Sequence, residues 1–370
     1  MLPIRCRLDD FTGYGQYSAE LVRSLVRMQE AEGFSLRVFP MAKAFYGTPT
    51  PPEIERVLSR CRNHAQTWEL LLYTLVVAGT ELAPGKPTVY FTMWESTRLP
   101  QPAIEKLNRC AVVIVPCSWC ASMFSAAGVE TPIRIVPLGI PMDCYEPGYP
   151  PSLGAYPESA SRDLATGQTG LPEAVERPFT FGTAARFEGG GIRKGFGLVV
   201  KAFQQAFGEA RDVRLRVKAF SDCPVRQVED ARIEVVKAHW TRAALAAWYQ
   251  SLDVFVSGSG SEGWGLHQQE AMACGRPVVG AHFSGVTEFF NPVNGYAVDY
   301  RLAPGQGVYN GLGVYALPET ESMAAQMRLA YENRELLGMK SVLARQSARS
   351  FTMENSARRL LAVLREFKFL

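Results

Sequence analysis

The sequence lacks several features that would identify its class at once. It contains no apolar run of the ~18 residues that a membrane-spanning helix needs. Its first ten residues, MLPIRCRLDD, have no apolar core of the kind found in signal peptides. A net charge of +3 over 370 residues is far from the strongly basic balance of a dedicated nucleic-acid-binding protein. These absences predict a cytoplasmic protein without a transmembrane segment.

The eight cysteines do not indicate a disulfide framework. They are scattered, and a chain of this length can form a sufficient core without crosslinks, so free buried thiols are expected. Cys117 and Cys120 form one Cys-x-x-Cys pair without a second pair or a neighbouring histidine, which disfavours a zinc or redox role. The sequence also lacks an Asp-x-Asp motif that would hold a divalent ion beside a diphosphate.

Strand-like and helix-like segments alternate along the chain, and the length suggests two domains. Short apolar strands separated by amphipathic helices favour parallel sheets covered on both faces, and therefore an α/β fold with two Rossmann-like domains. The first series of expected strands comprises residues 3–8, 34–40, 87–94, 111–118 and 133–139. The second series comprises strands at 179–185, 213–220, 253–259, 276–281 and 297–300, the last of them, with helices at 196–210, 244–252 and 266–275.

A segment rich in proline, glycine and serine separates the two series and is typical of a linker or surface insertion. It places an N-terminal domain at 1–150, a linker at 151–178 and a C-terminal domain at 179–350. An amphipathic helix in 351–370 closes the chain and could pack back on the N-terminal domain. Ligands of such folds bind beyond the carboxyl ends of the strands, where three loops carry suggestive residues.

The first loop, DDFTGYGQY, contains Gly13 and Gly15. These glycines would let the backbone approach a ligand at the start of the next helix. A dinucleotide site would require a further glycine at position 18, which is serine, and an acidic residue at the end of the second strand, which ends in proline. NAD binding is therefore disfavoured, and the loop is either a phosphate-binding turn or a plain strand-to-helix connection.

The second loop carries two cations, Arg186 after a strand and Lys194 at the start of a helix. Together they could bind a diphosphate, because arginine grips two oxygens through its fork and lysine adds a point charge. The alternative is a solvated basic turn.

The third loop, SEGWGLHQQEAMACGRPVVG, contains Glu262 and Glu270 around a glycine turn. A helix beginning at Leu266 would direct the N–H groups of Gly265 and Leu266 toward negative charge. Carboxylates accept hydrogen bonds from hydroxyls, so Glu262 could bind a sugar and Glu270 the two hydroxyls of a ribose. The alternative is a glutamate favoured by the helix dipole, followed by a second on the surface.

These motifs together resemble the retaining family 4 glycosyltransferases of GT-B architecture, whose Glu-x7-Glu motif the third loop fits residue for residue. The resemblance implies that Glu262 contacts the donor sugar and Glu270 the ribose, and that Arg186 and Lys194 neutralise the diphosphate. It implies further donor contacts from Gly13, Gly15, His239, Gly263, Trp264, Gly265 and Leu266, with Lys237 and Ala238 beside His239 near the base.

One position departs from the family pattern. Many members have a histidine after the strand that corresponds to VYFTMW, where this chain has Trp94 and Glu95. The sugar or acceptor subsite could therefore differ, with Glu95 orienting an acceptor hydroxyl or serving only as a partner in a loop ion pair.

The resemblance predicts transfer of a sugar from a UDP- or GDP-sugar to an acceptor hydroxyl with retention, catalysed by Arg186, Lys194 and Glu262 without a cofactor or metal. Another GT-B reaction, epimerisation of a nucleotide sugar or glycan phosphorolysis, and a non-catalytic nucleotide-sugar-binding protein remain as alternatives. The acceptor stays open between a saccharide, a lipid-linked sugar, a small metabolite and a hydroxylated DNA base, and the oligomeric state is undetermined.

Overall fold

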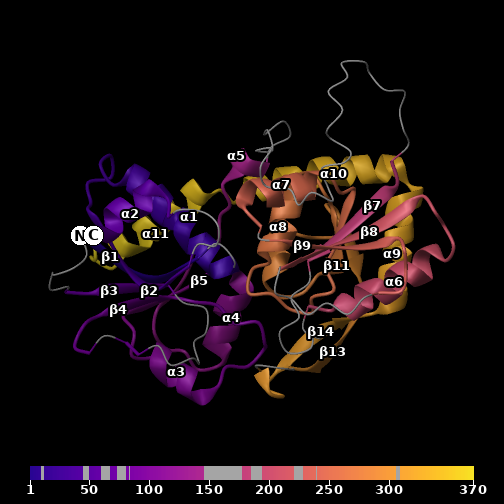
Figure 1. The fold of residues 1–370 in the computed structure, drawn as a ribbon. Helices are drawn as coiled ribbons and strands as arrows, with labels where there is room; N and C mark the ends of the chain where they lie inside the picture. The colour runs from indigo at the N-terminus through magenta and orange to yellow at the C-terminus, as the bar shows by residue number, and fades with distance from the viewer. Residues whose placement is uncertain are drawn as a thin grey trace, which may run out of the picture.

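The computed structural model describes residues 1–9, 12–44, 50–59, 67–72, 81–82, 84–145, 177–184, 194–220, 228–238, 240–305 and 309–370. They form two α/β halves side by side, an N-terminal half up to residue 145 and a C-terminal half from residue 177 (Figure 1). The expected linker at 151–178 lies outside the described residues, apart from its last two positions.

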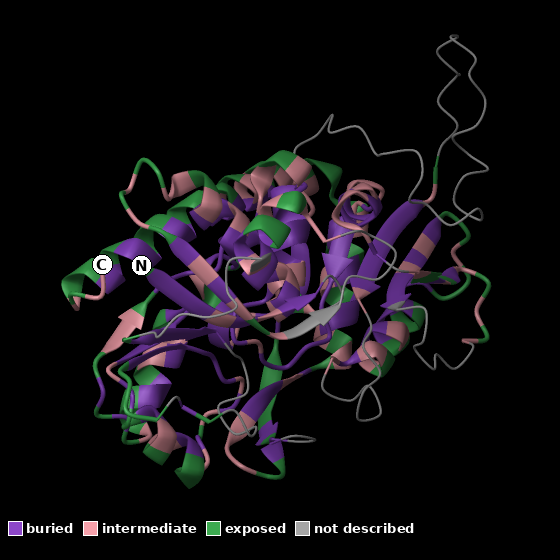
Figure 2. Ribbon diagram, turned by 60° about the vertical axis from the view of Figure 1, so that its left-hand side comes forward, coloured by how far each residue is buried: buried purple, intermediate pink, exposed green. Residues whose placement is uncertain are grey.

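The described residues of the N-terminal half form a parallel sheet of six strands in the order β2-β1-β3-β4-β5-β6. Most of its side chains are buried (Figure 2), as expected for a parallel sheet with helices on both faces. The strands are β1 (Leu2–Asp9), β2 (Leu36–Ala44), β3 (Glu69–Leu72), β4 (Thr88–Phe91), β5 (Val112–Val115) and β6 (Ile133–Ile135).

The described part of the C-terminal half repeats this plan in the order β12-β11-β10-β7-β8-β9, and a separate antiparallel hairpin pairs β13 with β14. The strands are β7 (Phe179–Ala184), β8 (Val213–Phe220), β9 (Ile233–Ala238), β10 (Val254–Val256), β11 (Val278–Ala281), β12 (Tyr296–Val298), β13 (Tyr300–Pro304) and β14 (Val314–Pro318).

Helices connect these strands, and within the described residues none is long and apolar enough to cross a lipid bilayer. They are α1 (Gly13–Met28), α2 (Pro52–Ser59), α3 (Gln101–Leu107), α4 (Ser118–Ala126), α5 (Met142–Tyr145), α6 (Phe196–Phe207), α7 (Arg242–Gln250), α8 (Leu266–Ala273), the 3₁₀ helix η3 (Ser284–Glu288), α9 (Thr320–Glu332), α10 (Arg334–Arg349) and α11 (Met353–Glu366).

The last helix leaves the C-terminal half and lies beside α1, so that the two chain ends are close together (Figure 1). Tyr17 on α1 and Ser356 on α11 share a buried hydrogen bond of 2.8 Å between their hydroxyl oxygens. Leu360 and Leu364 are fully buried and belong to the same apolar cluster as β1 and β4. This apolar face explains the amphipathic pattern of the segment.

One strand prediction is wrong, and the sequence pattern does not reveal two further strands. Residues 297–300 do not form the last strand, because β13 and β14 follow β12. Strand β3 was missed because ELLL is a short apolar run that periodicity cannot distinguish from part of a helix. Strand β9 was missed because its exposed Glu234 and Lys237 interrupt the apolar pattern at the outer edge of the sheet.

The strand order reverses once in each sheet, between β1 and β3 in the N-terminal half and between β7 and β10 in the C-terminal half. Loops that leave the carboxyl ends of strands at such a reversal diverge to opposite faces and leave room for a ligand between them. Gly13 begins α1 just after the loop that follows β1, and the loops after β7 and β10 carry Lys194 and Glu262. The topology therefore brings all three predicted loops to the carboxyl edges of the strands at these reversals.

Candidate functional site

Gly13 and Gly15 belong to the first turn of α1 rather than to the preceding loop, which corrects the prediction of a glycine loop there. Thr12 caps the helix, because its hydroxyl accepts a hydrogen bond of 2.9 Å from the Gly15 N–H. Asp9 in turn accepts bonds of 2.7 Å from both the N–H and the hydroxyl of Thr12. A Cβ atom at Gly15 would lie 2.2 Å from Cγ of Asp9, so this close approach requires glycine.

The start of α1 meets the start of α8, although the two helices belong to different halves. A Cβ atom at Gly13 would lie 3.3 Å from Cδ1 of Leu266. The prediction that α8 begins at Leu266 is confirmed, with Gly265 as its N-cap at φ +103°. A Cβ atom at Gly265 would also approach Cγ1 of Val286 to 2.6 Å, so both the backbone conformation and the space select glycine.

Lys194 and Glu262 form an ion pair at this junction, with Nζ donating to Oε1. Lys194 precedes α6, whose N-cap Gly195 has φ +62°. Glu262 is positioned by its own N–H, which donates to the Ser284 hydroxyl at 2.9 Å. The side chains of Lys194 and Glu262 are 20% and 12% exposed, so the pair is partly shielded but still reaches solvent. The expected second cation, Arg186, lies outside the described residues, as does His239.

Glu270 is almost completely buried and is held by two tyrosines that the sequence did not single out. Tyr145 on α5 donates to Oε1 at 2.8 Å, and Tyr249 on α7 donates to Oε2 at 3.0 Å. Burial would raise the pKa of Glu270, but hydrogen bonds from His267 and Tyr145 and the positive charge of Arg242 outweigh it and hold the pKa below its ordinary value. Glu270 is therefore an ionised carboxylate enclosed by protein donors.

His267 lies between this carboxylate and the surface. Its Nδ1 atom is 2.8 Å from the Tyr249 hydroxyl and 3.4 Å from Oε2 of Glu270. Its side chain is 39% exposed, whereas that of Glu270 is 4% exposed. Partial desolvation by the surrounding protein and the nearby Lys218 ammonium lower the pKa of His267, which favours the neutral imidazole.

A partly buried ion pair connects this group to the N-terminal half. Arg242 on α7 lies 3.3 Å from Oε1 of Glu20 on α1, and it also donates to the Tyr145 hydroxyl at 3.4 Å. Arg23 donates to the same glutamate at 2.7 Å. The carboxylate of the second motif glutamate is thus linked through Tyr145 and Arg242 to Glu20 on α1, about two turns after Gly13, which approaches Leu266.

The turn between the two glutamates packs tightly against the N-terminal half. A Cβ atom at Gly263 would lie 2.3 Å from Sδ of Met93, and the Gly263 carbonyl accepts a bond of 3.4 Å from the Cys117 thiol. Trp264 is buried, and its Nε1 donates to Gln269 Oε1 at 2.7 Å. The Trp264 ring is therefore part of the hydrophobic core, and only the backbone of this residue can make the predicted ligand contact.

The six cysteines within the described residues are free, and five of them are buried, as predicted. They are Cys6, Cys110, Cys117, Cys120, Cys144 and Cys274. Cys117 caps α4 by accepting from the Cys120 N–H at 3.4 Å. No group of three or more histidine, cysteine, aspartate or glutamate side chains that could hold a metal ion occurs in the described part of the chain.

Trp94 and Glu95, at the position of the departure from the family pattern, contact the β13–β14 hairpin of the other half. Trp94 is buried, donates from Nε1 to the Arg98 carbonyl at 2.7 Å and meets the Tyr309 ring edge-on at 5.0 Å. The Tyr309 hydroxyl donates to Oε2 of Glu95. Beside it, Thr97 accepts from the Val314 N–H at 2.9 Å. The hairpin therefore bridges the halves at Glu95.

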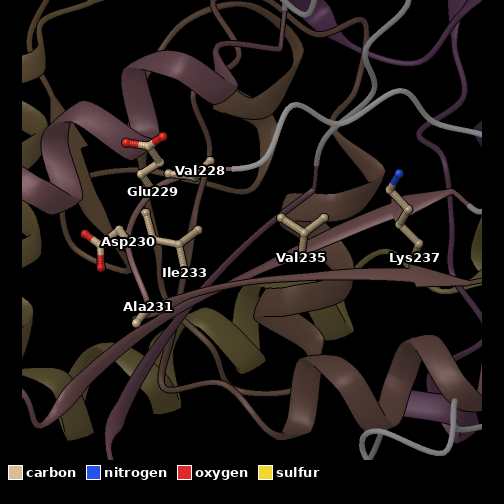
Figure 3. Close-up of a pocket in the computed structure, with 7 residues that line it drawn as sticks. All are labelled: Val228, Glu229, Asp230, Ala231, Ile233, Val235 and Lys237. Atoms are coloured by element: carbon tan, nitrogen blue, oxygen red, sulfur yellow. The ribbon is translucent and has the colours of Figure 1, made fainter.

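An open pocket of about 630 Å³ follows β9 at the outer edge of the C-terminal sheet. Figure 3 shows Glu229 and Asp230 at one end and Lys237 at the other. Of the residues that line this pocket, only Lys237 lies near the carboxyl end of β9, where parallel sheets bind ligands. Lys237 also belongs to the segment predicted to lie near the base. Most of the pocket is therefore unrelated to the junction of Lys194 and Glu262.

Residues 178–305 match the family model described as glycosyl transferases group 1. This region contains Lys194, Glu262 and Glu270. The D-inositol 3-phosphate glycosyltransferase of Xylanimonas cellulosilytica is 31% identical over 175 residues, which are 45% of this chain and 39% of that enzyme. The matched part thus spans about two-fifths of the length of this curated relative.

Two solved structures are similar over almost the entire chain. Sucrose-phosphate synthase from Thermosynechococcus elongatus has a TM-score of 0.68 at 15% identity, covering 99% of each chain. Anabaena HepE, solved in complex with UDP and glucose, has a TM-score of 0.64 at 15% identity, covering 99% of this chain and 100% of the other. The fold is therefore the α/β fold of GT-B glycosyltransferase structures with parallel sheets, as the sequence predicted, and each sheet has six strands in the described residues.

Proposed function

We propose that the protein is a retaining glycosyltransferase that moves a sugar from a nucleoside diphosphate sugar to an acceptor hydroxyl. The observation that carries this proposal is the Lys194–Glu262 pair, which lies where the starts of α1 and α8 meet, inside the region that matches glycosyl transferases group 1. A cation for the diphosphate and a carboxylate for sugar hydroxyls stand side by side there, next to the N–H groups at the start of a helix.

The charge that the reaction develops matches these groups. As the bond between the anomeric carbon and the diphosphate oxygen breaks, negative charge grows on the leaving group, and a bond forms to the acceptor oxygen. Lys194 and the N–H groups at Gly265 and Leu266 would stabilise that charge, with Arg186 as the second cation. The acceptor proton would pass to the departing phosphate, so the reaction needs no separate base.

Lys194 can serve Glu262 and a phosphate at the same time, because an ammonium has three donors. The ion pair would then hold the cation in place before the donor arrives, and little reorganisation would be needed in the transition state. Glu262 would accept a hydrogen bond from a sugar hydroxyl.

The names of the similar proteins support a UDP-sugar as the first donor to test, since HepE was solved with UDP and glucose. GDP-sugars remain the alternative donor class, and the acceptor remains among a saccharide, a lipid-linked sugar, a small metabolite and a hydroxylated DNA base. We expect transfer without a metal, because Lys194 and the helix start supply the positive field at the leaving group.

Thermal-shift measurements against a panel of UDP- and GDP-sugars test the donor, because a ligand that binds only the folded state raises Tm. NMR of the product formed from the stabilising donor then shows whether the anomeric configuration is retained. Absence of stabilisation by every nucleotide sugar would contradict the proposal, and so would an inverted product. Loss of transfer in EDTA that Mn²⁺ restores would disprove metal independence.

A further inference from the structure

The two halves are joined differently at the two ends of their junction. At one end the chain crosses back to the N-terminal half between α10 and α11, where Ile140 donates to the Phe351 carbonyl and accepts from the Met353 N–H, both at 3.1 Å. The helix α11 that follows buries Leu360 and Leu364 completely. Exposure of each leucine would cost about 1.5–3 kcal/mol, so apolar packing fixes this end of the junction.

The β13–β14 hairpin joins the halves at the other end, away from α5 and α10 (Figure 1). It binds the loop after β4 through hydrogen bonds. The Ser96 hydroxyl donates to the Leu312 carbonyl at 2.5 Å. The Thr97 N–H donates to the Val314 carbonyl at 3.3 Å, and the Val314 N–H donates back to the Thr97 hydroxyl at 2.9 Å. Each such bond contributes only about 0.5–1.5 kcal/mol net, because water replaces it when it breaks.

The same hairpin is bonded within its own half to the loop that carries Glu262. The Ala316 N–H donates to the Gly260 carbonyl at 3.1 Å. The fit is close, because a Cβ atom at Gly260 would lie 1.8 Å from the Ala316 oxygen. Gly260 is two residues before Glu262 in the chain. The hairpin therefore lies between the loop after β4 in one half and the Glu262 loop in the other.

The close contact of the halves leaves little space at Glu262. The cavity that Glu262 lines together with Ser261 and Phe283 has a volume of about 10 Å³. Sites for small molecules usually have about 300–1,000 Å³. Met93 of the N-terminal half also packs directly against the turn at Gly263. A nucleotide sugar therefore needs the halves to move apart before it can enter beside Glu262.

We propose that the β13–β14 hairpin is a latch, which fastens the loop after β4 to the Glu262 loop through Ser96, Thr97 and Val314. Its release opens the junction at the end away from the α10–α11 crossing, because opening there breaks hydrogen bonds that water replaces, whereas detaching α11 would expose leucines. The latch itself goes beyond the proposed function and does not depend on it. Only its consequence for donor exchange rests on that function.

Two glycines of the hairpin provide a matched pair of variants. A Cβ atom at Gly313 would lie 2.4 Å from the Ser96 hydroxyl oxygen and 2.8 Å from the Arg98 nitrogen, so Gly313→Ala forces the latch apart. Gly311 has a similar backbone conformation, with φ +79° against +69° at Gly313. A Cβ atom at Gly311 would meet no atom of the described residues within 4 Å. Gly311→Ala therefore carries the same backbone strain without touching the N-terminal half.

Amide hydrogen exchange of the full chain, read at single residues and without any ligand, tests the latch. The Thr97 and Val314 N–H groups report the contact between the halves, and the Ala316 N–H reports the attachment of the hairpin to its own half. In Gly313→Ala we expect Thr97 and Val314 to exchange at least about fivefold faster than in Gly311→Ala, as the loss of two neutral hydrogen bonds implies. Exchange at Ala316 should be the same in both variants.

Three results would overturn the latch. They are unchanged exchange at Thr97 and Val314 in Gly313→Ala, equal acceleration in Gly311→Ala, and equal acceleration at Ala316, which would mean that the hairpin does not stay on its own half. Ser96→Ala keeps the test decisive if Gly313→Ala does not fold, because it removes one hydroxyl and adds no atom. It should accelerate exchange at Thr97 and Val314 by about 2- to 12-fold, and unchanged exchange there would also overturn the latch.

Nucleotide release tests the consequence for the donor. Dissociation of UDP and GDP, followed by stopped-flow fluorescence, should be at least about fivefold faster from Gly313→Ala than from Gly311→Ala, because the open junction no longer encloses the ligand. Equal dissociation rates would overturn the enclosing role of the latch. If neither nucleotide binds the unchanged protein, the proposed function fails, while the exchange measurement still decides whether the hairpin is a latch.

Discussion

The two halves share one architectural plan but contribute different kinds of residue to the site. Each has six parallel strands in its described part, with one reversal of strand order. The C-terminal half supplies Lys194, Glu262 and His267, which are charged or titratable and partly exposed. The N-terminal half supplies Gly13 of α1 and the thiol of Cys117, which lie against Leu266 and Gly263 of the motif.

This difference matches the extent of the family resemblance. The glycosyl transferases group 1 match covers residues 178–305 and stops short of the N-terminal half. The charged residues that a sequence pattern can identify are therefore concentrated in the C-terminal half. The N-terminal half contacts these residues' loops by close packing, which many different sequences can achieve.

The largest effect should come from removing the cation of the C-terminal half. Lys194→Ala should lower kcat of sugar transfer on the order of 10²-fold or more, because a preorganised charge at the leaving group is lost. Lys201→Ala is the matched control, since Lys201 is an exposed lysine on the adjoining helix α6. Steady-state kinetics with the donor found by thermal shift measures both. Near-normal turnover of Lys194→Ala would show that this lysine does not stabilise the diphosphate leaving group.

Sequence patterns were sufficient where the deciding residues are close in the chain. The spacing of Glu262 and Glu270 and the glycine before Leu266 fix the start of α8 by local geometry, and the structure confirms that start. The partners of Glu270 could not be read in this way. Tyr145 lies 125 positions away, just before the segment expected to be a linker, and only the tertiary fold brings it to the carboxylate.

The N-terminal half shows that even a contact between residues close in the chain can leave no sequence pattern. The sequence identified Gly15 as a residue that favours a turn, but the reason for glycine there is the carboxylate of Asp9 against the first turn of α1. Glu95 was placed at a subsite by resemblance, whereas its partner Tyr309 is 214 positions distant. Neither contact produces a hydrophobic periodicity or a motif spacing that could be recognised in the sequence.

The second prediction compares a glycine from each half. Gly15→Ala should destabilise the protein by about 1–3 kcal/mol, because the added methyl group overlaps the Asp9 carboxylate in a buried position. Gly197→Ala on α6 meets no atom within 4 Å and should stabilise the fold by up to about 1 kcal/mol through helix propensity. Tm and urea midpoints measure both. Equal stability of the two variants would show that α1 can move away from Asp9.

A smaller effect should follow from loosening the bridge between the halves. Tyr309→Phe removes the hydrogen bond to Glu95 and should raise KM for the acceptor, or lower kcat, by about tenfold, which corresponds to the lower end of the roughly 1.5–3 kcal/mol that a hydrogen bond to a charged group contributes. Tyr331→Phe is the matched control, because Tyr331 also donates to a carboxylate, that of Asp212, on the exposed side of the C-terminal half. If both variants retain full activity, Glu95 does not depend on the hairpin.

The smallest effect should come from the surface ion pair that joins α11 to the N-terminal half. Arg365 donates to Oε2 of Glu32 at 2.8 Å, and the two side chains are 46% and 31% exposed. Water and salt screen such a pair, so Glu32→Gln should change the free energy of unfolding by less than about 1 kcal/mol. Leu360→Ala on the same helix should cost about 2–5 kcal/mol, because Leu360 is fully buried. A larger loss for Glu32→Gln than for Leu360→Ala would mean that charge, rather than apolar packing, holds α11 on the half it joins.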